Sequence, residues 1–137
     1  MLIRTYRERA VPARFPVYVL SRGYNAGRPG YKPWVNSFEI LCKDEEEQER
    51  IFHLVNALYL AKGFEYYITG SVIPMLRLAD FKKLILQNLE LINNPLLVEQ
   101  LKSLLKMQAL QQKYEKMLII MKQMIYAQAK KNVNKHL

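Results

Sequence analysis

The sequence predicts an α+β fold, in which a small mixed or antiparallel sheet with one amphipathic helix precedes a long, coiled-coil-like helix at the C-terminus. Two short runs, at 15–22 and 34–42, are rich in β-branched and aromatic residues, a capped helix begins after Asp44, and no glycine or proline follows Pro95. With 137 residues, half of them hydrophobic, the chain is long enough to bury the core of one domain.

A long loop separates the two predicted strands. Residues 15–22 read FPVYVLSR and residues 34–42 read WVNSFEILC, and both runs favour strands. The intervening GYNAGRPGYKPW contains three glycines and two prolines, which would interrupt any strand or helix. We therefore expect two antiparallel strands joined by a loop. The loop presents basic and aromatic side chains: Arg22, Tyr24, Arg28, Tyr31 and Lys32.

The clearest helix in the first two thirds of the chain begins with the acidic run 44–49. Asp44 is a good N-cap, Glu47 three positions later completes a capping box, and Gly63 ends the helix. Apolar residues at helical spacing form one buried face: Ile51, Leu54, Val55 and Leu58. Helix chemistry explains the acidic run better than a metal site or an acidic partner surface, and His53 is interpreted as an ordinary helix residue.

The stretch 68–83, ITGSVIPMLRLADFKK, is interpreted as a turn followed by a short helix. Gly70 and Ser71 make the turn, and Pro74 forces the residue before it into an extended conformation. The segment LADFKKLIL should then form one or two helical turns and continue as a strand. This strand is the apolar run Leu84, Ile85 and Leu86.

A helix of about 35 residues, roughly 50 Å long, is predicted from Asn94 and Pro95, which suit the N-cap and the first helical position. We therefore assign 1–93 to a small α+β domain and 94–137 to a helix that is not an independent domain. Apolar residues recur along the helix in steps of three and four, as in a coiled-coil seam: Met107, Leu110, Tyr114, Met117, Met121 and Met124. An adjacent stripe widens this face: Leu104, Leu118 and Ile125. The seam needs a cover, which is the chain's own globular part, a second copy in a homodimer, or the helix of a partner protein.

The net charge of +9 is concentrated at the two ends of the sequence. Residues 1–36 hold seven basic side chains and one acidic, residues 37–100 hold six basic and ten acidic, and residues 101–137 hold eight lysines and one glutamate. Two basic flanks favour contact with DNA or another polyanion. For the C-terminal segment, a solvated lysine face is an equally good interpretation.

The sequence lacks the motifs of common enzyme classes, such as a glycine-rich phosphate loop, G-x-S-x-G or H-E-x-x-H. One cysteine, Cys42, excludes an internal disulfide and a multi-cysteine metal site, and only His53 and His136 could serve it as a base. No apolar run approaches the roughly 18 residues of a membrane span, and residues 1–15 lack the apolar core of a signal peptide. We expect a cytoplasmic protein without catalytic activity, cofactor or membrane contact.

Over residues 38–86 the features follow a specific order. The strand FEILC leads to a helix over 47–61, an aromatic stretch, the turn GSVIPML and the helical segment LADFKKL. This order resembles the second half of a target recognition domain in the specificity subunits of type I restriction-modification enzymes. In that family a G-S-x-x-P-x-L turn and a short helix precede a strand and a long helix, which packs in a coiled coil.

The chain also departs from that family. Residues 1–93 are fewer than a family recognition domain contains, so much of its DNA-facing first half would be missing. LQNLELINNPLLVEQ stands where the family has a PLPPLEEQ segment. The chain is also similar to short uncharacterised bacterial proteins, a resemblance that implies no activity.

Charge and resemblance together predict a non-catalytic, recognition-domain-like nucleic-acid-binding module that dimerises or docks through its C-terminal helix. If 70–74 occupy the family's turn, three nearby cations would contact phosphates without reading bases: Arg77, Lys82 and Lys83. The loop is the better candidate for groove contact, because its cations alternate with aromatic rings that include Trp34. Alternatively, the loop rings pack over the core and the chain is a protein-interaction or assembly subunit with no nucleic-acid role.

Overall fold

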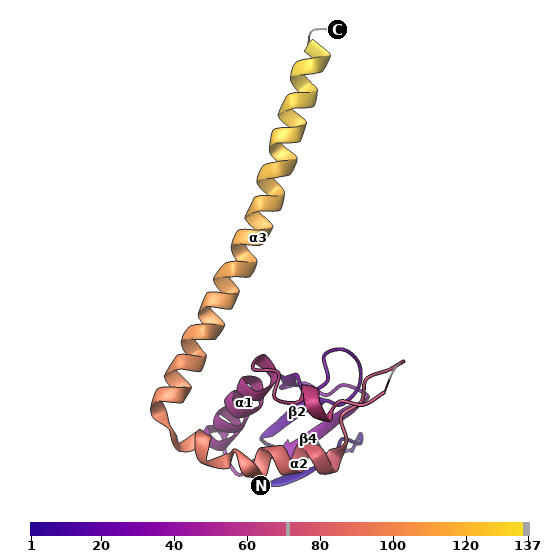
Figure 1. Cartoon of the computed structure of the whole chain (residues 1–137), viewed down its shortest axis with the longest axis vertical. Helices are drawn as coiled ribbons and strands as arrows, with labels where there is room; N and C mark the ends of the chain where they lie inside the picture. Colours follow the sequence, from indigo (N-terminus) through magenta and orange to yellow (C-terminus); the bar gives the residue numbers. More distant parts are fainter. Residues whose placement is uncertain (71, 136–137) are drawn as a thin grey trace. The chain divides into compact units, whose positions relative to one another are not determined.

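The computed structural model describes residues 1–70 and 72–135. The chain forms two compact units, Met1–Val98 and Glu99–Leu137, which we call unit 1 and unit 2. Unit 1 contains a four-stranded antiparallel sheet and the shorter helices, and the described part of unit 2 is helical (Figure 1). The predicted α+β class is confirmed.

The sheet has the strand order β1-β4-β2-β3. Strands β2 (Pro16–Leu20) and β4 (Ser37–Leu41) lie within the two predicted runs and pair antiparallel, with Val17 opposite Ile40. The sequence did not reveal the two edge strands, β1 (Leu2–Thr5) and β3 (Pro29–Gly30). The first pairs with β4, and the second lies inside the predicted loop and pairs with β2.

Helix α1 (Glu45–Leu60) begins as predicted, because the Asp44 side chain accepts a hydrogen bond of 2.8 Å from the Glu47 backbone N–H. The reciprocal half of the expected capping box is not formed by Glu47 Oε1. Within the described residues this buried oxygen has no hydrogen-bond partner.

The end of α1 differs from the prediction that Gly63 stops the helix. Lys62 takes the left-handed conformation, with φ of 58°, and its N–H donates to the Tyr59 carbonyl at 3.1 Å. The Gly63 N–H donates to the Leu58 carbonyl at 2.7 Å. This is a Schellman motif with lysine where glycine is usual. Gly63 contributes by allowing a close approach, since a Cβ there would lie 3.1 Å from the Leu58 carbonyl oxygen.

The expected strand at 84–86 was wrong, because these residues belong to helix α2 (Leu78–Gln87). Its buried residues are Phe81, Leu84 and Ile85, which follow the i, i+3, i+4 spacing of one helical face. The short helices η1 (Glu65–Tyr67) and η2 (Leu89–Asn93) lie before and after α2. The strand that the resemblance implies before the long helix is therefore absent between Leu78 and Asn93.

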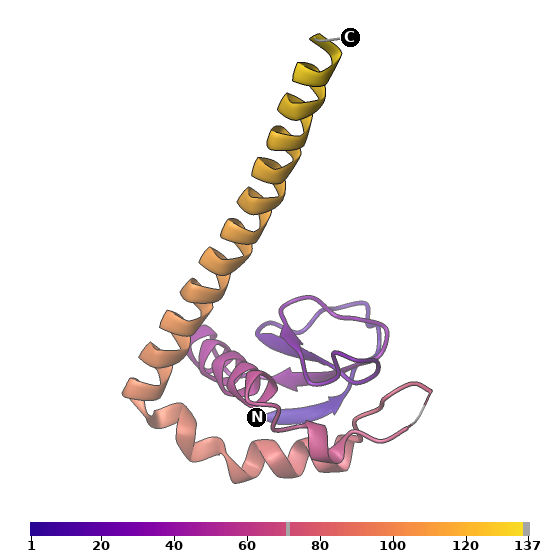
Figure 2. The same cartoon turned by 45° about the horizontal axis from the view of Figure 1, so that its top comes forward.

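One face of the sheet and the two helices α1 and α2 form the core of unit 1 (Figures 1 and 2). Alternate residues of β2 and β4 point into it, together with the buried faces of both helices: Val17, Val19, Phe38, Ile40, Ile51, Leu54, Val55, Phe81, Leu84 and Ile85. The rings of Phe38 and Phe81 stack with centroids 4.9 Å apart. Burial of each such side chain contributes roughly 1.5–3 kcal/mol, and helical spacing places all three buried side chains of α2 on one face.

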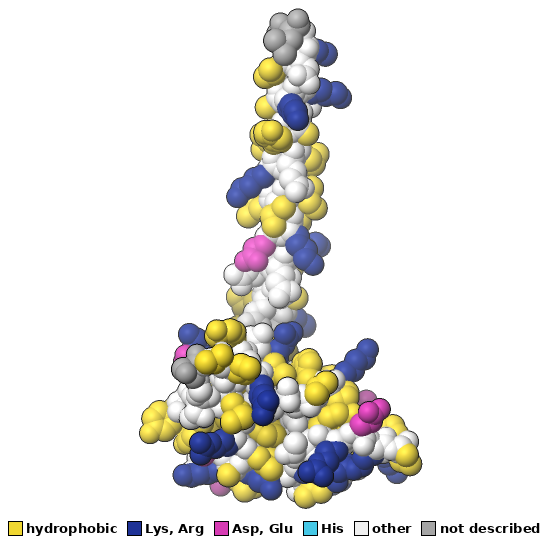
Figure 3. Space-filling view, turned by 90° about the vertical axis from the view of Figure 1, so that its right-hand side faces the viewer, with side chains coloured by type: hydrophobic (Ala, Val, Ile, Leu, Met, Phe, Trp, Pro, Cys, Tyr) yellow, Lys and Arg dark blue, Asp and Glu magenta, His cyan; other side chains and the backbone are white. Residues whose placement is uncertain are grey.

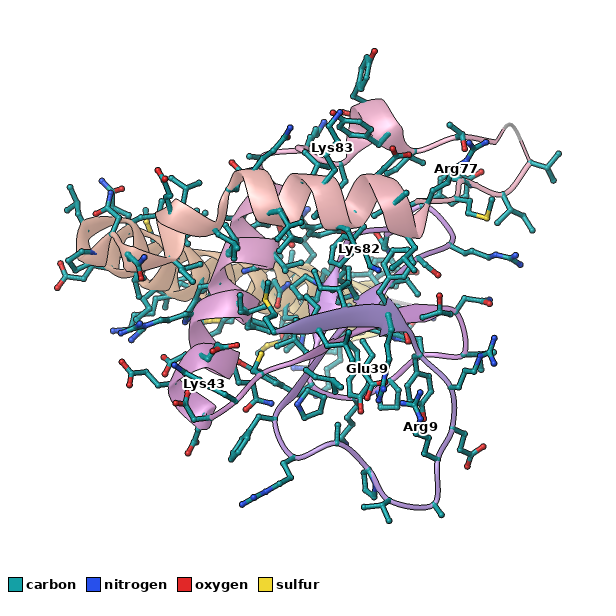
Figure 4. All side chains as sticks on the ribbon, turned by 90° about the horizontal axis from the view of Figure 1, so that it is seen from below. Arg9, Glu39, Lys43, Arg77, Lys82 and Lys83 are labelled. Atoms are coloured by element: carbon teal, nitrogen blue, oxygen red, sulfur yellow. The ribbon has the colours of Figure 1, made fainter. Side chains whose placement is uncertain are left out.

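The other face of the sheet carries a row of polar residues across three strands. Glu39 lies opposite Arg4 on β1 and Tyr18 on β2. Its buried carboxylate accepts bonds of 3.2 Å from both Arg4 and Arg9 (Figure 4). Burial, then the Glu39 charge, raise the pKa of Tyr18, whose ring meets that of Tyr6 edge-on. The pair of arginines thus fastens the N-terminal segment to this face.

Helix α3 (Pro95–Lys135) has 41 residues and is longer than predicted. The Asn94 side chain accepts a hydrogen bond of 3.1 Å from the Leu96 N–H, as expected for the N-cap. The expected boundary at 93/94 lies inside unit 1, which includes the first residues of α3. In the part of the chain that the structure describes, no helix has both the length and the apolar character needed to cross a membrane.

Candidate nucleic-acid interface

The turn after η1 and the predicted loop meet at the C-terminal end of β2. The hairpin of residues 69–75 is closed by two backbone hydrogen bonds between Thr69 and Met75, of 2.9 and 2.7 Å. Gly70 has φ of 109°, and a Cβ there would lie 2.6 Å from the Ile73 carbonyl oxygen, so the turn requires glycine. Ser71 lies outside the described residues. The hairpin projects from unit 1 in Figure 2.

Backbone pairing places this hairpin beside the end of β2. Arg22 forms a bridge with Met75, the Gly23 N–H donates to the Pro74 carbonyl at 2.8 Å, and the Leu76 N–H donates to the Ser21 carbonyl at 2.9 Å. Arg77 follows immediately and is the N-cap residue of α2 (Figure 4). Two cations that are 55 positions apart in the sequence, Arg22 and Arg77, are therefore held at one end of the sheet.

The loop brings a third cation to the same place. The Leu20 N–H donates to the Arg28 carbonyl at 2.9 Å, and the Gly27 N–H donates to the Leu20 carbonyl at 2.7 Å. Between these anchors Tyr24 is 90% exposed. We call the four residues that surround this end of the strand the β2-end surface: Arg22, Tyr24, Arg28 and Arg77.

A pocket of about 300 Å³ opens beside Tyr24. Its floor is apolar and includes Ala26 and Phe64, and its rim carries Tyr24, Lys62 and Glu65. Tyr59, which also lines the pocket, donates a hydrogen bond of 3.1 Å to the Asn25 side chain. Sequence reasoning missed Lys62 at this rim, because its left-handed backbone conformation leaves no local signal in the sequence.

Two aromatic residues of the predicted loop pack onto unit 1. Tyr31 stacks on Phe52 of α1, with centroids 4.5 Å apart, and burial, then the charge of Glu49, raise the pKa of the phenol. Trp34 lies over Gly30, where a Cβ would come within 2.8 Å of the indole ring. One face of the Tyr31 ring is thus covered, so of the two loop tyrosines only Tyr24 is fully presented.

The other predicted cations do not converge on the β2-end surface. Lys32 follows β3, which runs back along β2 toward Tyr18. Lys82 and Lys83 are exposed on α2 and project from different sides of that helix (Figure 4). The structure therefore brings together Arg22, Arg28 and Arg77 and leaves the three lysines outside the group.

The three arginines of the β2-end surface are available to anions. Within the described residues, no carboxylate lies at salt-bridge distance from any of them, whereas Arg4, Arg9 and Arg50 all pair with glutamates. Figure 3 shows dark blue basic side chains spread over one face of unit 1, interspersed with exposed hydrophobic ones. In the hairpin, the side chains of Val72 and Ile73 are exposed.

Cys42 is the one residue of unit 1 that the sequence identified as a possible nucleophile. Burial, followed by the charge of Glu47, raises the pKa of Cys42 to about 11, so the thiol is protonated at neutral pH. His136, its other possible base, lies outside the described residues. Within the described ranges, no three His, Cys, Asp or Glu side chains gather as metal ligands would.

All six residues of the predicted seam lie on α3 and are exposed: Met107, Leu110, Tyr114, Met117, Met121 and Met124. Of the adjacent stripe, Leu104, Leu118 and Ile125 are likewise exposed.

Comparison with known proteins gives one match. The model of a family of unknown function, DUF6943, matches residues 3–131. The chain belongs to the DUF6943 family. No curated protein and no solved structure matches it. The match runs from β1 into α3, so the DUF6943 pattern includes the sheet, both core helices and most of the long helix.

Proposed function

We propose that this chain is a non-catalytic nucleic-acid-binding module and that the β2-end surface contacts the nucleic acid. The observation that carries the proposal is the convergence of three carboxylate-free arginines from two distant segments beside one fully exposed tyrosine. Arginines supply salt-dependent attraction to phosphates, and an exposed ring can stack on a base.

The resemblance to target recognition domains supports the same assignment. The order of β4, α1, the 69–75 hairpin, α2 and a long helix follows that scheme, except that the strand expected between α2 and α3 is absent. The two exposed aliphatic residues of the hairpin, Val72 and Ile73, have the character of side chains that wedge between base steps. A cytoplasmic location remains part of this proposal.

The test compares two variants that remove the same charge from different places. Arg22→Ala with Arg28→Ala empties part of the β2-end surface, and Lys43→Ala with Arg50→Ala removes two cations from the acidic start of α1. Fluorescence anisotropy on a random duplex is recorded between about 50 and 200 mM salt.

We expect the Arg22/Arg28 variant to bind roughly 10- to 100-fold more weakly and to lower the slope of log K against log salt by about 2. The Lys43/Arg50 variant should stay within about twofold of the parent. Equal losses of affinity in both variants would mean that binding depends only on the net charge of the chain and not on the β2-end surface. No binding of the parent to DNA or RNA at about 50 mM salt would refute the proposal.

A second candidate, a protein-interaction or assembly subunit, is favoured by the exposed seam on α3. In that case Met117→Asp would abolish a complex formed through α3 and leave the fold of unit 1 intact. Retention of the complex with this variant would exclude the seam as the contact.

A further inference from the structure

A strongly apolar exposed surface of the described chain is the segment 117–126 of α3, which reads MLIIMKQMIY. Eight of its ten residues are large and apolar, and each is between 47% and 69% exposed: Met117, Leu118, Ile119, Ile120, Met121, Met124, Ile125 and Tyr126. At about half exposure these side chains present on the order of 800 Å², the contribution of each partner to a standard interface. Monomers seldom leave so large a patch uncovered.

The distribution of these residues around the helix indicates how many partners cover it. With Met107, Tyr114 and Met121 at heptad position a and Leu110, Met117 and Met124 at d, Leu118 and Ile125 fall at e and Ile120 falls at g. A two-stranded coiled coil requires an apolar a/d seam, whereas a face that includes e and g is typical of a helix in a larger bundle. The segment 117–126 therefore has the face of a bundle helix.

Further copies of this chain suit that face electrostatically. In a parallel, in-register bundle, position g of one helix lies beside position e of the next heptad of its neighbour. Lys113 then meets Leu118, Ile120 meets Ile125, and Lys106 meets Gln111. These contacts bring no like charges together, and the lysine stems can cover apolar neighbours while their ammonium groups reach water.

We propose that α3 self-associates as a parallel bundle of three or more copies of this chain, with the apolar residues of 117–126 at positions a, d, e and g buried at its centre. Ile119 and Tyr126, at position f, face outward from this bundle. The proposal is independent of nucleic-acid binding, because it concerns unit 2 alone and is tested by measuring the mass of the assembly.

The principal test is light scattering of the full chain after size exclusion, at several concentrations. The parent is expected to have at least three times the 16.2 kDa mass of one chain. The variant Leu118→Gln with Ile120→Gln and Ile125→Gln removes the e and g contacts and should fall to two chains or fewer. The matched variant Ile119→Gln with Tyr126→Gln should keep the parent mass.

Several outcomes would overturn the proposal: a monomeric or dimeric parent, an e/g variant with unchanged mass, or an f variant that dissociates equally. A monomer that instead binds an acidic amphipathic peptide or vesicles of anionic lipid would assign the face to a different occupant. Far-ultraviolet circular dichroism distinguishes dissociation from loss of the sheet in unit 1.

A cysteine at position a tests the orientation. Gln128→Cys in a Cys42→Ser background places the new thiols beside one another in a parallel bundle. Mild oxidation should then link most chains in pairs. An antiparallel arrangement would separate these thiols, so absence of the link in an assembly of the expected mass would refute the parallel orientation.

Discussion

At the scale of single residues, Glu39 shows most clearly how burial determines the stability that a substitution removes. The carboxylate is buried, with 3% of its side chain exposed, whereas its partners Arg4 and Arg9 are 33% and 41% exposed. Each arginine can turn to water if the carboxylate is removed. The carboxylate cannot reach water if the arginines are removed.

This asymmetry predicts unequal losses of stability. Arg4→Ala with Arg9→Ala should lower the free energy of unfolding by about 3 kcal/mol, because a buried charge is left unpaired. Glu39→Gln should cost only about 1 kcal/mol. Urea unfolding measures both, and Arg50→Ala, which breaks an exposed pair with Glu46, should change stability by less than about 0.5 kcal/mol. A costlier Glu39→Gln would contradict this account.

Lys62 stores strain at the end of α1. Because only glycine adopts a φ of 58° freely, Lys62→Gly should raise the free energy of unfolding by about 0.5–1 kcal/mol. Ala61→Gly is the control, since Ala61 has φ of −80° and gains only backbone freedom in the unfolded chain. That variant should lose about 0.5–1 kcal/mol. If the m-values of the two variants are equal, the denaturant midpoint should rise for Lys62→Gly and fall for Ala61→Gly.

Cys42 gives stability a dependence on alkaline pH. Its pKa is raised from 9.0 to about 11 by burial, so above pH 9 the unfolded chain loses this proton before the folded chain does. The contribution is therefore complete below pH 9 and lost as pH rises toward 11. We expect the parent to lose on the order of 1–2 kcal/mol more than Cys42→Ala over this window. If the free energies of unfolding of the two proteins changed in parallel with pH over this window, the predicted role of Cys42 would be wrong.

At the scale of elements, the sequence revealed those whose signals are local. The N-cap at Asp44 and the helical spacing after it identified α1, and Asn94-Pro95 with no later breaker identified α3. The edge strand β1 depends on a partner strand that lies 33 or more positions away, with Thr5 opposite Phe38 and Leu2 opposite Leu41. The local sequence around β1 therefore does not predict this long-range pairing. The segment Leu84-Ile85-Leu86 is helical because helical spacing brings Phe81, Leu84 and Ile85 together on the buried face of α2.

The candidate interface likewise depends on long-range contacts that the local sequence does not predict. Composition identified the basic, aromatic loop, but the approach of Arg77 to Arg22 depends on the bridge between Arg22 and Met75. Sequence reasoning therefore grouped Arg77 with Lys82 and Lys83, which come five and six positions after it in the chain. Long-range backbone pairing instead groups it with Arg22 and Arg28.

The loop between β2 and β4 is held against the core at Gly27. Its φ is 98°, and a Cβ there would collide with the Phe64 ring. Gly23 has a similar φ of 93° but open space around it, so it isolates the cost of backbone strain. We expect Gly23→Ala to cost about 1 kcal/mol and Gly27→Ala about 3 kcal/mol. If thermal unfolding showed equal losses of stability for the two variants, the loop would have to move to accommodate the added methyl group at position 27.

At the scale of the whole molecule, the two units should respond differently to dilution. Because most of the stability of a helix in a protein comes from the packing of its apolar face, the helicity of unit 2 should depend on association. A 100-fold dilution should lower the melting temperature of the far-ultraviolet helical signal by about 5 °C or more. The near-ultraviolet signal of the aromatic core of unit 1 should not move. Coincident, concentration-independent transitions would mean that α3 is stable alone.

The packing of Trp34 over Gly30 has a practical consequence. Trp34 is the only tryptophan in the chain, and it lies in the loop that also presents Arg28 and Tyr24. Emission excited selectively at the red edge of protein absorption therefore comes from this loop alone. The molecule carries its own optical reporter, with which occupancy of the loop can be followed without a dye and separately from any event on α3.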